Sequence, residues 1–98
     1  MAAARIDKYL WAIRAFKTRT DATDACKGGK VKIAGVNAKP SKEVKPGDIL
    51  TVKKGTVTYT YKVLQPLERR VGAKLVPEYA LNLTPAAELE KLRAPVET

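Results

Sequence analysis

The order of apolar and polar residues near the N-terminus follows the period of an α-helix. In the segment RIDKYLWAIRAF, residues 5–16, Ile6, Leu10 and Ile13 are spaced at i, i+4 and i+7, and Phe16 continues the series. Residues at this spacing share one face of a helix. We therefore predict a first amphipathic helix over residues 5–16, with this apolar face in the core.

Trp11 lies off the apolar stripe of this helix, which leaves two interpretations open. Either the C-terminal half of the chain covers the indole, or the ring stays partly exposed to solvent. We favour packing against the C-terminal half.

A second helix, poorer in large apolar residues, is predicted to begin after Thr18. Asp21 lies three residues after Thr18, where the acid of a capping box belongs. The inward stripe consists of small residues, Ala22, Ala25 and Cys26. Such a helix can pack closely against its neighbour. Gly28 or Gly29 is expected to end it in the left-handed conformation.

The rest of the chain alternates with the period of β-strands. KVKIAGVNA, residues 30–38, predicts a tight hairpin around Gly35, and Pro46-Gly47 predicts a turn. ILTVKKGTVTYTYKVL, residues 49–64, predicts the clearest strand pair. One face of its second strand is apolar: Val57, Tyr59, Tyr61 and Val63.

Thr84-Pro85 predicts the start of a short helix that runs through Leu89 and Leu92 and stops before Pro95. The pattern as a whole predicts an α+β fold. Two N-terminal helices pack on a small, twisted antiparallel sheet, and a C-terminal strand pair and short terminal helix complete it.

Composition limits the chemistry that this fold can carry. The 98 residues suit one domain, and 45 % of them are hydrophobic. The sequence has no histidine and one cysteine, Cys26, so we expect no disulfide framework, no metal site, no cofactor and no catalysis. Cys26 is most simply a buried small hydrophobe, because a catalytic thiol would need a histidine. No apolar run approaches the roughly 18 residues of a membrane span, and we expect a cytoplasmic protein.

Charge points to a partner. Nineteen Lys or Arg residues against ten Asp or Glu give a net charge of +9. Residues 1–54 hold 13 basic and 5 acidic residues, whereas residues 55–98 hold 6 and 5. This asymmetry favours a polyanion bound by the N-terminal half, although a solvated basic face without a partner stays possible. RNA is favoured over a membrane, because no segment combines these lysines with a wide apolar face.

The quoted residues also resemble a known family. RIDKYLWAIRAFKTRTDATDACKGGKVKIAG, followed by KPS and VKPGDIL, is similar to the S4 domain, or alpha-L RNA-binding motif, over residues 5–50. RIDKYLW, FKTR, GGKV and KPSKEV most resemble its small, ribosome-associated heat-shock protein 15 group, and LERRVGA does so more loosely. The resemblance implies a motif at residues 1–54, and residues 55–98 as an extension that completes the same domain.

The resemblance also implies the partner and the site. The protein would be a monomer without catalytic activity that binds RNA of the large ribosomal subunit, in rescue or recycling of stalled particles. Asp7, paired with a nearby base, and Leu10 would be structural. With the basic residues Lys8 and Lys42 added, the expected RNA-binding residues are Arg5, Lys8, Lys17, Thr18, Arg19, Lys27, Gly29, Lys30, Lys32, Lys39, Ser41 and Lys42.

Two alternative functions stay open: an accessory domain of an rRNA-modifying enzyme, such as a pseudouridine synthase or methyltransferase, and a basic protein-interaction module. The sequence departs from the family at Ala34-Gly35, where Asn-Gly is common, and alanine is costly at positive φ. Related members tend to continue into a basic tail. Because this chain stops at Thr98, we expect a truncated or shortened variant.

Overall fold

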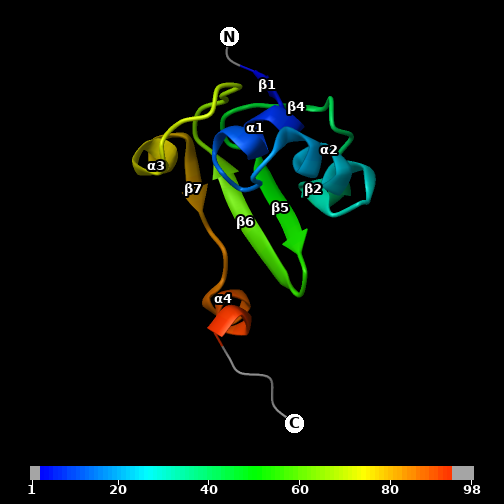
Figure 1. The fold of residues 1–98 in the computed structure, drawn as a ribbon, viewed down its shortest axis with the longest axis vertical. Coiled ribbons are helices and arrows are strands. Elements are labelled where there is room, and N and C mark those ends of the chain that lie inside the picture. The colour runs from blue at the N-terminus through cyan, green and yellow to red at the C-terminus, as the bar shows by residue number, and fades with distance from the viewer. Residues whose placement is uncertain (1–2, 94–98) are drawn as a thin grey trace.

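Within residues 3–93, which the computed structural model describes, two helices pack against a five-stranded antiparallel sheet (Figure 1). The elements follow in the order β1 (Ala4–Arg5), α1 (Ile6–Ala12), α2 (Arg19–Lys27), β2 (Val31–Ile33), β3 (Val36–Asn37), β4 (Glu43–Val44), β5 (Ile49–Lys54), β6 (Val57–Val63), η1 (Ala73–Leu75), α3 (Val76–Tyr79), β7 (Ala80–Asn82) and α4 (Ala86–Arg93). The predicted α+β class is confirmed.

The sheet has the strand order β3-β2-β5-β6-β7, and every pair in it is antiparallel. Its longest ladder joins β5 to β6, from Ile49 opposite Lys62 to Lys54 opposite Val57, and confirms the predicted strand pair. A separate short ladder joins β1 to β4. The sequence pattern gave no sign of this second ladder or of β7.

Helix α1 is shorter than predicted. It ends at Ala12, because Arg14 adopts a positive φ of 67° and turns the chain back. The amide of Arg14 donates to the carbonyl of Trp11, and the amide of Ala15 donates to that of Leu10, which together form a Schellman motif. The prediction of a helix to residue 16 was therefore wrong at its end, although Phe16 still packs in the core.

Helix α2 begins after Thr18 and ends at the glycine pair, as predicted. The Thr18 hydroxyl accepts a 3.0 Å hydrogen bond from the amide of Asp21, as an N-cap should. Gly29, at a φ of 74°, ends the helix in the left-handed conformation. Ala25 and Cys26 are buried, so α2 lies close to its neighbours.

Residues 67–73 cover the end of α1. The amide of Val71 donates to the carbonyl of Ala12, and Nε of Arg14 donates to the carbonyl of Val71 at 2.8 Å. Arg70 donates from Nη1 to the carbonyl of Lys17 at 2.8 Å, and its guanidinium lies 5.8 Å from the centre of the Trp11 ring. Packing of Trp11 against the C-terminal half is therefore confirmed.

Where β6 extends past its ladder with β7, side chains of the C-terminal segment accept hydrogen bonds from its backbone amides. Glu88 of α4 accepts from the amide of Thr58 at 2.8 Å, and the Thr84 hydroxyl accepts from the amide of Thr60 at 3.0 Å. These contacts fix α4 against the sheet. The predicted helix stop at Pro95 and the side chain of Leu92 lie outside the described part of the chain.

Candidate nucleic-acid interface

The predicted RNA-binding residues lie at separate places around the two helices. One set begins α1, a second begins α2, and a third surrounds the end of α2, the β2–β3 hairpin and the loop after it. Most of these side chains are exposed, whereas Arg5, Lys8 and Gly29 are half-buried. Of the third set, the structure brings five residues together around two adjoining hollows: Lys27, Gly29, Lys39, Ser41 and Lys42.

The cations at the start of α1 have acidic neighbours. The buried carboxylate of Asp7 accepts hydrogen bonds from Arg5 at 3.1 and 2.9 Å and from the amide of Lys8 at 2.7 Å. Nζ of Lys8 lies 3.8 Å from Glu68. The predicted pairing of Asp7 with a nearby base is confirmed. Because Asp7 offsets part of its positive charge, Arg5 attracts an anionic ligand less strongly than an unpaired arginine would.

Asp7 remains charged despite its burial. Burial raises the pKa of this carboxyl, but hydrogen bonds from the side chains of Arg5 and Thr23 and from the Lys8 amide outweigh that effect and hold it below its usual value. Because Thr23 belongs to α2, the same carboxylate ties the start of α1 to the middle of α2.

The start of α2 offers unpaired cations. Within residues 3–93, the side chains of Lys17 and Arg19 make no ion pair. They flank the N-terminal end of a nine-residue helix, where the dipole favours negative charge. The Thr18 hydroxyl already accepts from Asp21, so Thr18 shapes this end.

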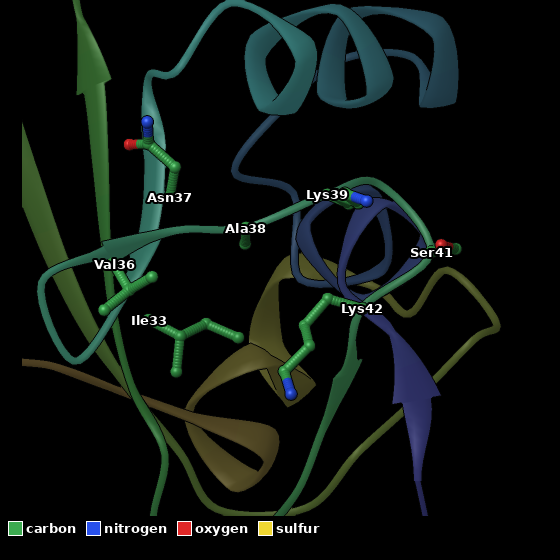
Figure 2. Close-up of a pocket in the computed structure, with 7 residues that line it drawn as sticks. All are labelled: Ile33, Val36, Asn37, Ala38, Lys39, Ser41 and Lys42. Atoms are coloured by element: carbon green, nitrogen blue, oxygen red, sulfur yellow. The ribbon is translucent and has the colours of Figure 1, made fainter.

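Two adjoining hollows lie between α2, the β2–β3 hairpin and the following loop. The first, which we call the hairpin hollow, has a volume of about 550 Å³ and is lined by Ile33, Val36, Asn37, Ala38, Lys39, Ser41 and Lys42 (Figure 2). The second, the helix hollow, has a volume of about 360 Å³ and is lined by Cys26, Lys27, Gly29, Asn37, Ala38, Lys39 and Pro40. Residues 37–39 line both, so the two hollows adjoin along this segment of the chain.

The loop that lines the hollows is held by α1. The amide of Ile6 donates to the carbonyl of Lys42 at 2.7 Å, and the amide of Asp7 donates to that of Pro40 at 3.3 Å. Amides at the start of a helix have no partner within the helix, so the loop satisfies two of them. The same bonds fix the backbone around Lys39 and Lys42.

Lys30 and Lys32 lie outside both hollows. Side chains alternate across a strand, so Lys32 faces away from the side of β2 on which Val31 is fully buried. The chain of Lys30 folds near the end of α2, with its Cε 4.0 Å from where a Cβ on Gly28 would lie. Their place on a surface shared with the hollows remains a prediction.

Sequence reasoning missed four residues of the hairpin hollow: Ile33, Val36, Asn37 and Ala38. Ile33 and Val36 are cross-strand partners, and Val36 is 69 % exposed at the hairpin. Asn37 stands where the hollows meet. The available signal was the hairpin itself: its register places Ile33 and Val36 on one face of a turn flanked by lysines.

Residues 3–93 contain no group of three or more acidic, histidine or cysteine residues that could hold a metal ion. Over the same residues, no helix has the length and apolar character needed to cross a membrane.

Comparison with known proteins assigns the chain to a family. The S4 domain family model matches residues 4–50. The RQC P-site tRNA stabilizing factor of Helicobacter pylori is 48 % identical over 58 residues, which cover 57 % of this chain and 69 % of that protein. The chain belongs to the S4 domain family. The S4 match extends from β1 into β5 and so includes both hollows, and the resemblance noted over residues 5–50 is confirmed.

Other S4 relatives carry the heat shock protein 15 name. The heat shock protein 15 homolog of Aeromonas salmonicida is 44 % identical over 71 residues, 72 % of this chain and 54 % of that protein. The chain thus spans about half the length of the relative. A trimeric structure of Vibrio cholerae heat shock protein 15 matches with a TM-score of 0.79 and 35 % identity, and covers 91 % of this chain and 88 % of that one.

Proposed function

We propose that the protein binds RNA of the large ribosomal subunit through the start of α2 and the two hollows. The observation that carries this proposal is that the lysines around the hollows make no ion pair within residues 3–93. Cations without internal partners can displace the counterions condensed on RNA phosphates, and this release supplies a large share of the affinity of proteins for nucleic acid. Arg5 and Lys8 would contribute less, because acids lie beside them.

The biological role that we propose resembles that of the named relatives. The chain would act on stalled or dissociated ribosomal particles, as a monomer in the cytoplasm and without catalysis. The H. pylori relative is named as a factor that stabilises tRNA at the P site. A contact with tRNA on the large subunit is therefore part of the proposal.

Sedimentation with purified ribosomal particles tests this function. We expect the protein to sediment with large subunits in a sucrose gradient and to be released by nuclease. The double variant Lys39→Ala/Lys42→Ala should remain near the top of the gradient, with an unchanged melting temperature. Lys62→Ala/Lys74→Ala removes the same charge from exposed positions outside the interface and serves as the matched control.

Two results would contradict the proposal. If both double variants sediment like the wild type, the hollows have no part in binding. If the protein stays with the particles after their RNA has been digested, its partner is a protein and the interface is a basic protein-interaction surface.

A further inference from the structure

The hairpin hollow has apolar walls that phosphate binding alone does not require. Ile33 and Val36 lie on one side of it, and the side chain of Lys42 extends along the other (Figure 2). Val36 is 69 % exposed, the largest exposure among the exposed large apolar residues of the described chain. Apolar surface held in water beside free lysines favours a ligand that has both an apolar face and negative charge.

Unengaged polar groups accompany these walls. Within residues 3–93, the Asn37 amide and the Ser41 hydroxyl make no side-chain hydrogen bond. The Asn37 amide nitrogen lies 3.6 Å from where a Cβ on Gly29 would stand, so it lies toward the helix hollow, as Figure 2 also shows. The Asn37 amide therefore faces away from Ile33 and Val36, so the apolar walls and the lysines are what favour a base in this hollow.

A nucleotide combines these features. The volume of about 550 Å³ lies within the range of roughly 300 to 1,000 Å³ that is usual for small-ligand sites. Paired bases are stacked inside a helix, and only an unpaired nucleotide can turn its base into a hollow on a protein. An apolar side chain of a partner protein could also pack against these walls, but the surrounding lysines favour a polyanion as the ligand.

We propose that the hairpin hollow binds the base of one unpaired nucleotide, while Lys39 and Lys42 contact the phosphates beside it. This inference rests on the proposed RNA binding and specifies its target as an RNA stem with a bulged or looped-out nucleotide. The lining residues are aliphatic or polar, so the base would pack on the methyl groups of Ile33 and Val36 and not on an aromatic ring.

Two synthetic RNA hairpins test this inference. Both contain one 2-aminopurine in the stem. In the first hairpin no base stands opposite it, so it is bulged, and in the second a uridine opposite pairs with it. The wild type should bind the bulged hairpin about tenfold more tightly, the preference that roughly 1.4 kcal/mol of buried apolar surface provides. The fluorescence of 2-aminopurine in the bulged hairpin should rise on binding. Stacking on other bases quenches this fluorescence, and no aromatic ring lines the hollow to replace that stacking.

Val36→Ser should reduce this preference to less than about threefold, because it removes apolar surface and leaves every charge in place. Affinity for the paired hairpin should not change. Leu81→Ser alters a leucine on β7 that is 45 % exposed and lies outside both hollows, and it should keep the wild-type preference. Melting curves of both variants confirm that each is folded.

The outcomes separate this inference from the proposed function. Equal binding of both hairpins by the wild type overturns the inference alone, and binding of neither overturns both. A Val36→Ser variant that keeps the wild-type preference also overturns the inference. If that variant binds whole large subunits more weakly as well, the hollow contacts a ribosomal protein.

Discussion

Oδ2 of Asp7 lies 2.9 Å from Nη2 of Arg5, and the two side chains differ in exposure, at 1 % for Asp7 and 43 % for Arg5. The pair thus joins a buried anion to a cation that still reaches solvent. Because Thr23 donates to the same carboxylate, the pair connects both helices of the S4 domain.

We expect Asp7→Asn to lower the free energy of unfolding by about 1 to 3 kcal/mol, because the amide cannot accept all of these hydrogen bonds. The folded-state pKa of Asp7 lies below its ordinary value of 3.8, so its stabilisation is complete above that value and is lost as the pH falls through the folded pKa. Urea denaturation at pH 7 and pH 3 should show the gap between wild type and variant shrinking in acid. If the difference in free energy of unfolding between wild type and variant is the same or larger at pH 3, the charge of Asp7 does not stabilise the fold. Asp24→Asn, on an exposed position of α2, controls for a lost surface charge.

Arg19→Ala tests the start of α2. If Arg19 binds one phosphate, the variant should bind RNA more weakly by about 1.5 to 3 kcal/mol. Its slope of log affinity against log salt should fall by roughly 0.7 to 0.9. The melting temperature should stay the same, because Arg19 has no ion pair within residues 3–93. Lys74→Ala removes one charge elsewhere and should leave slope and affinity unchanged; unchanged values for Arg19→Ala as well would remove Arg19 from the interface.

Arg70→Ala should destabilise the fold by about 1 to 2 kcal/mol. The change removes a hydrogen bond to the carbonyl of Lys17 and the contact with the Trp11 ring. Thermal unfolding of Arg70→Ala beside Arg69→Ala, an exposed neighbour, measures this effect. Equal melting temperatures for the two variants would mean that residues 67–73 do not stabilise α1.

The Cys26 thiol should be inert in the folded protein. It is 4 % exposed, and burial together with the negative charge of Asp7 raises its pKa to about 11. Alkylation at pH 8 should therefore be slow in buffer and fast in denaturant. Rapid labelling of the native protein would show that the thiol is accessible.

Ala34→Asn should raise the free energy of unfolding by about 0.5 to 1 kcal/mol. Ala34 and Gly35 both have positive φ, 51° and 82°, as the type I′ turn of a two-residue hairpin requires. Asparagine tolerates this conformation better than alanine does. Chemical denaturation of the variant checks the gain, and a loss of stability would mean that Ala34 makes a favourable contact that asparagine disturbs.

Local signals explain which elements the sequence could predict. Thr18 and Gly29 bond to groups within a few residues, so the ends of α2 follow from residue type and spacing. Arg14 has no such signal, because arginine rarely adopts positive φ and its partner, Val71, lies 57 residues away. The end of α1 is therefore a tertiary effect.

The same distinction applies to the site. Charge and spacing were enough to select Lys39 and Lys42 as candidates, because lysine side chains are nearly always exposed and their positions can be read from the sequence. The hollow between these lysines and Val36 could not be predicted from the sequence, because its width depends on the distance between the loop and the hairpin. The bonds from the amides of Ile6 and Asp7 set that distance, and nothing in the loop's own residues encodes them.

The S4 match ends at Leu50, in the interior of a sheet. Leu50 pairs with Ile33 of β2 on one side and with Tyr61 of β6 on the other, and its side chain is fully buried. The segment that the family model matches thus ends inside the sheet, and the predicted division at residue 54 lies between β5 and β6, two neighbouring strands of that sheet. In this chain β6 covers the edge of β5 that would otherwise present unpaired amides and carbonyls to solvent, so the residues after the matched segment close the sheet that carries the hairpin and its hollows.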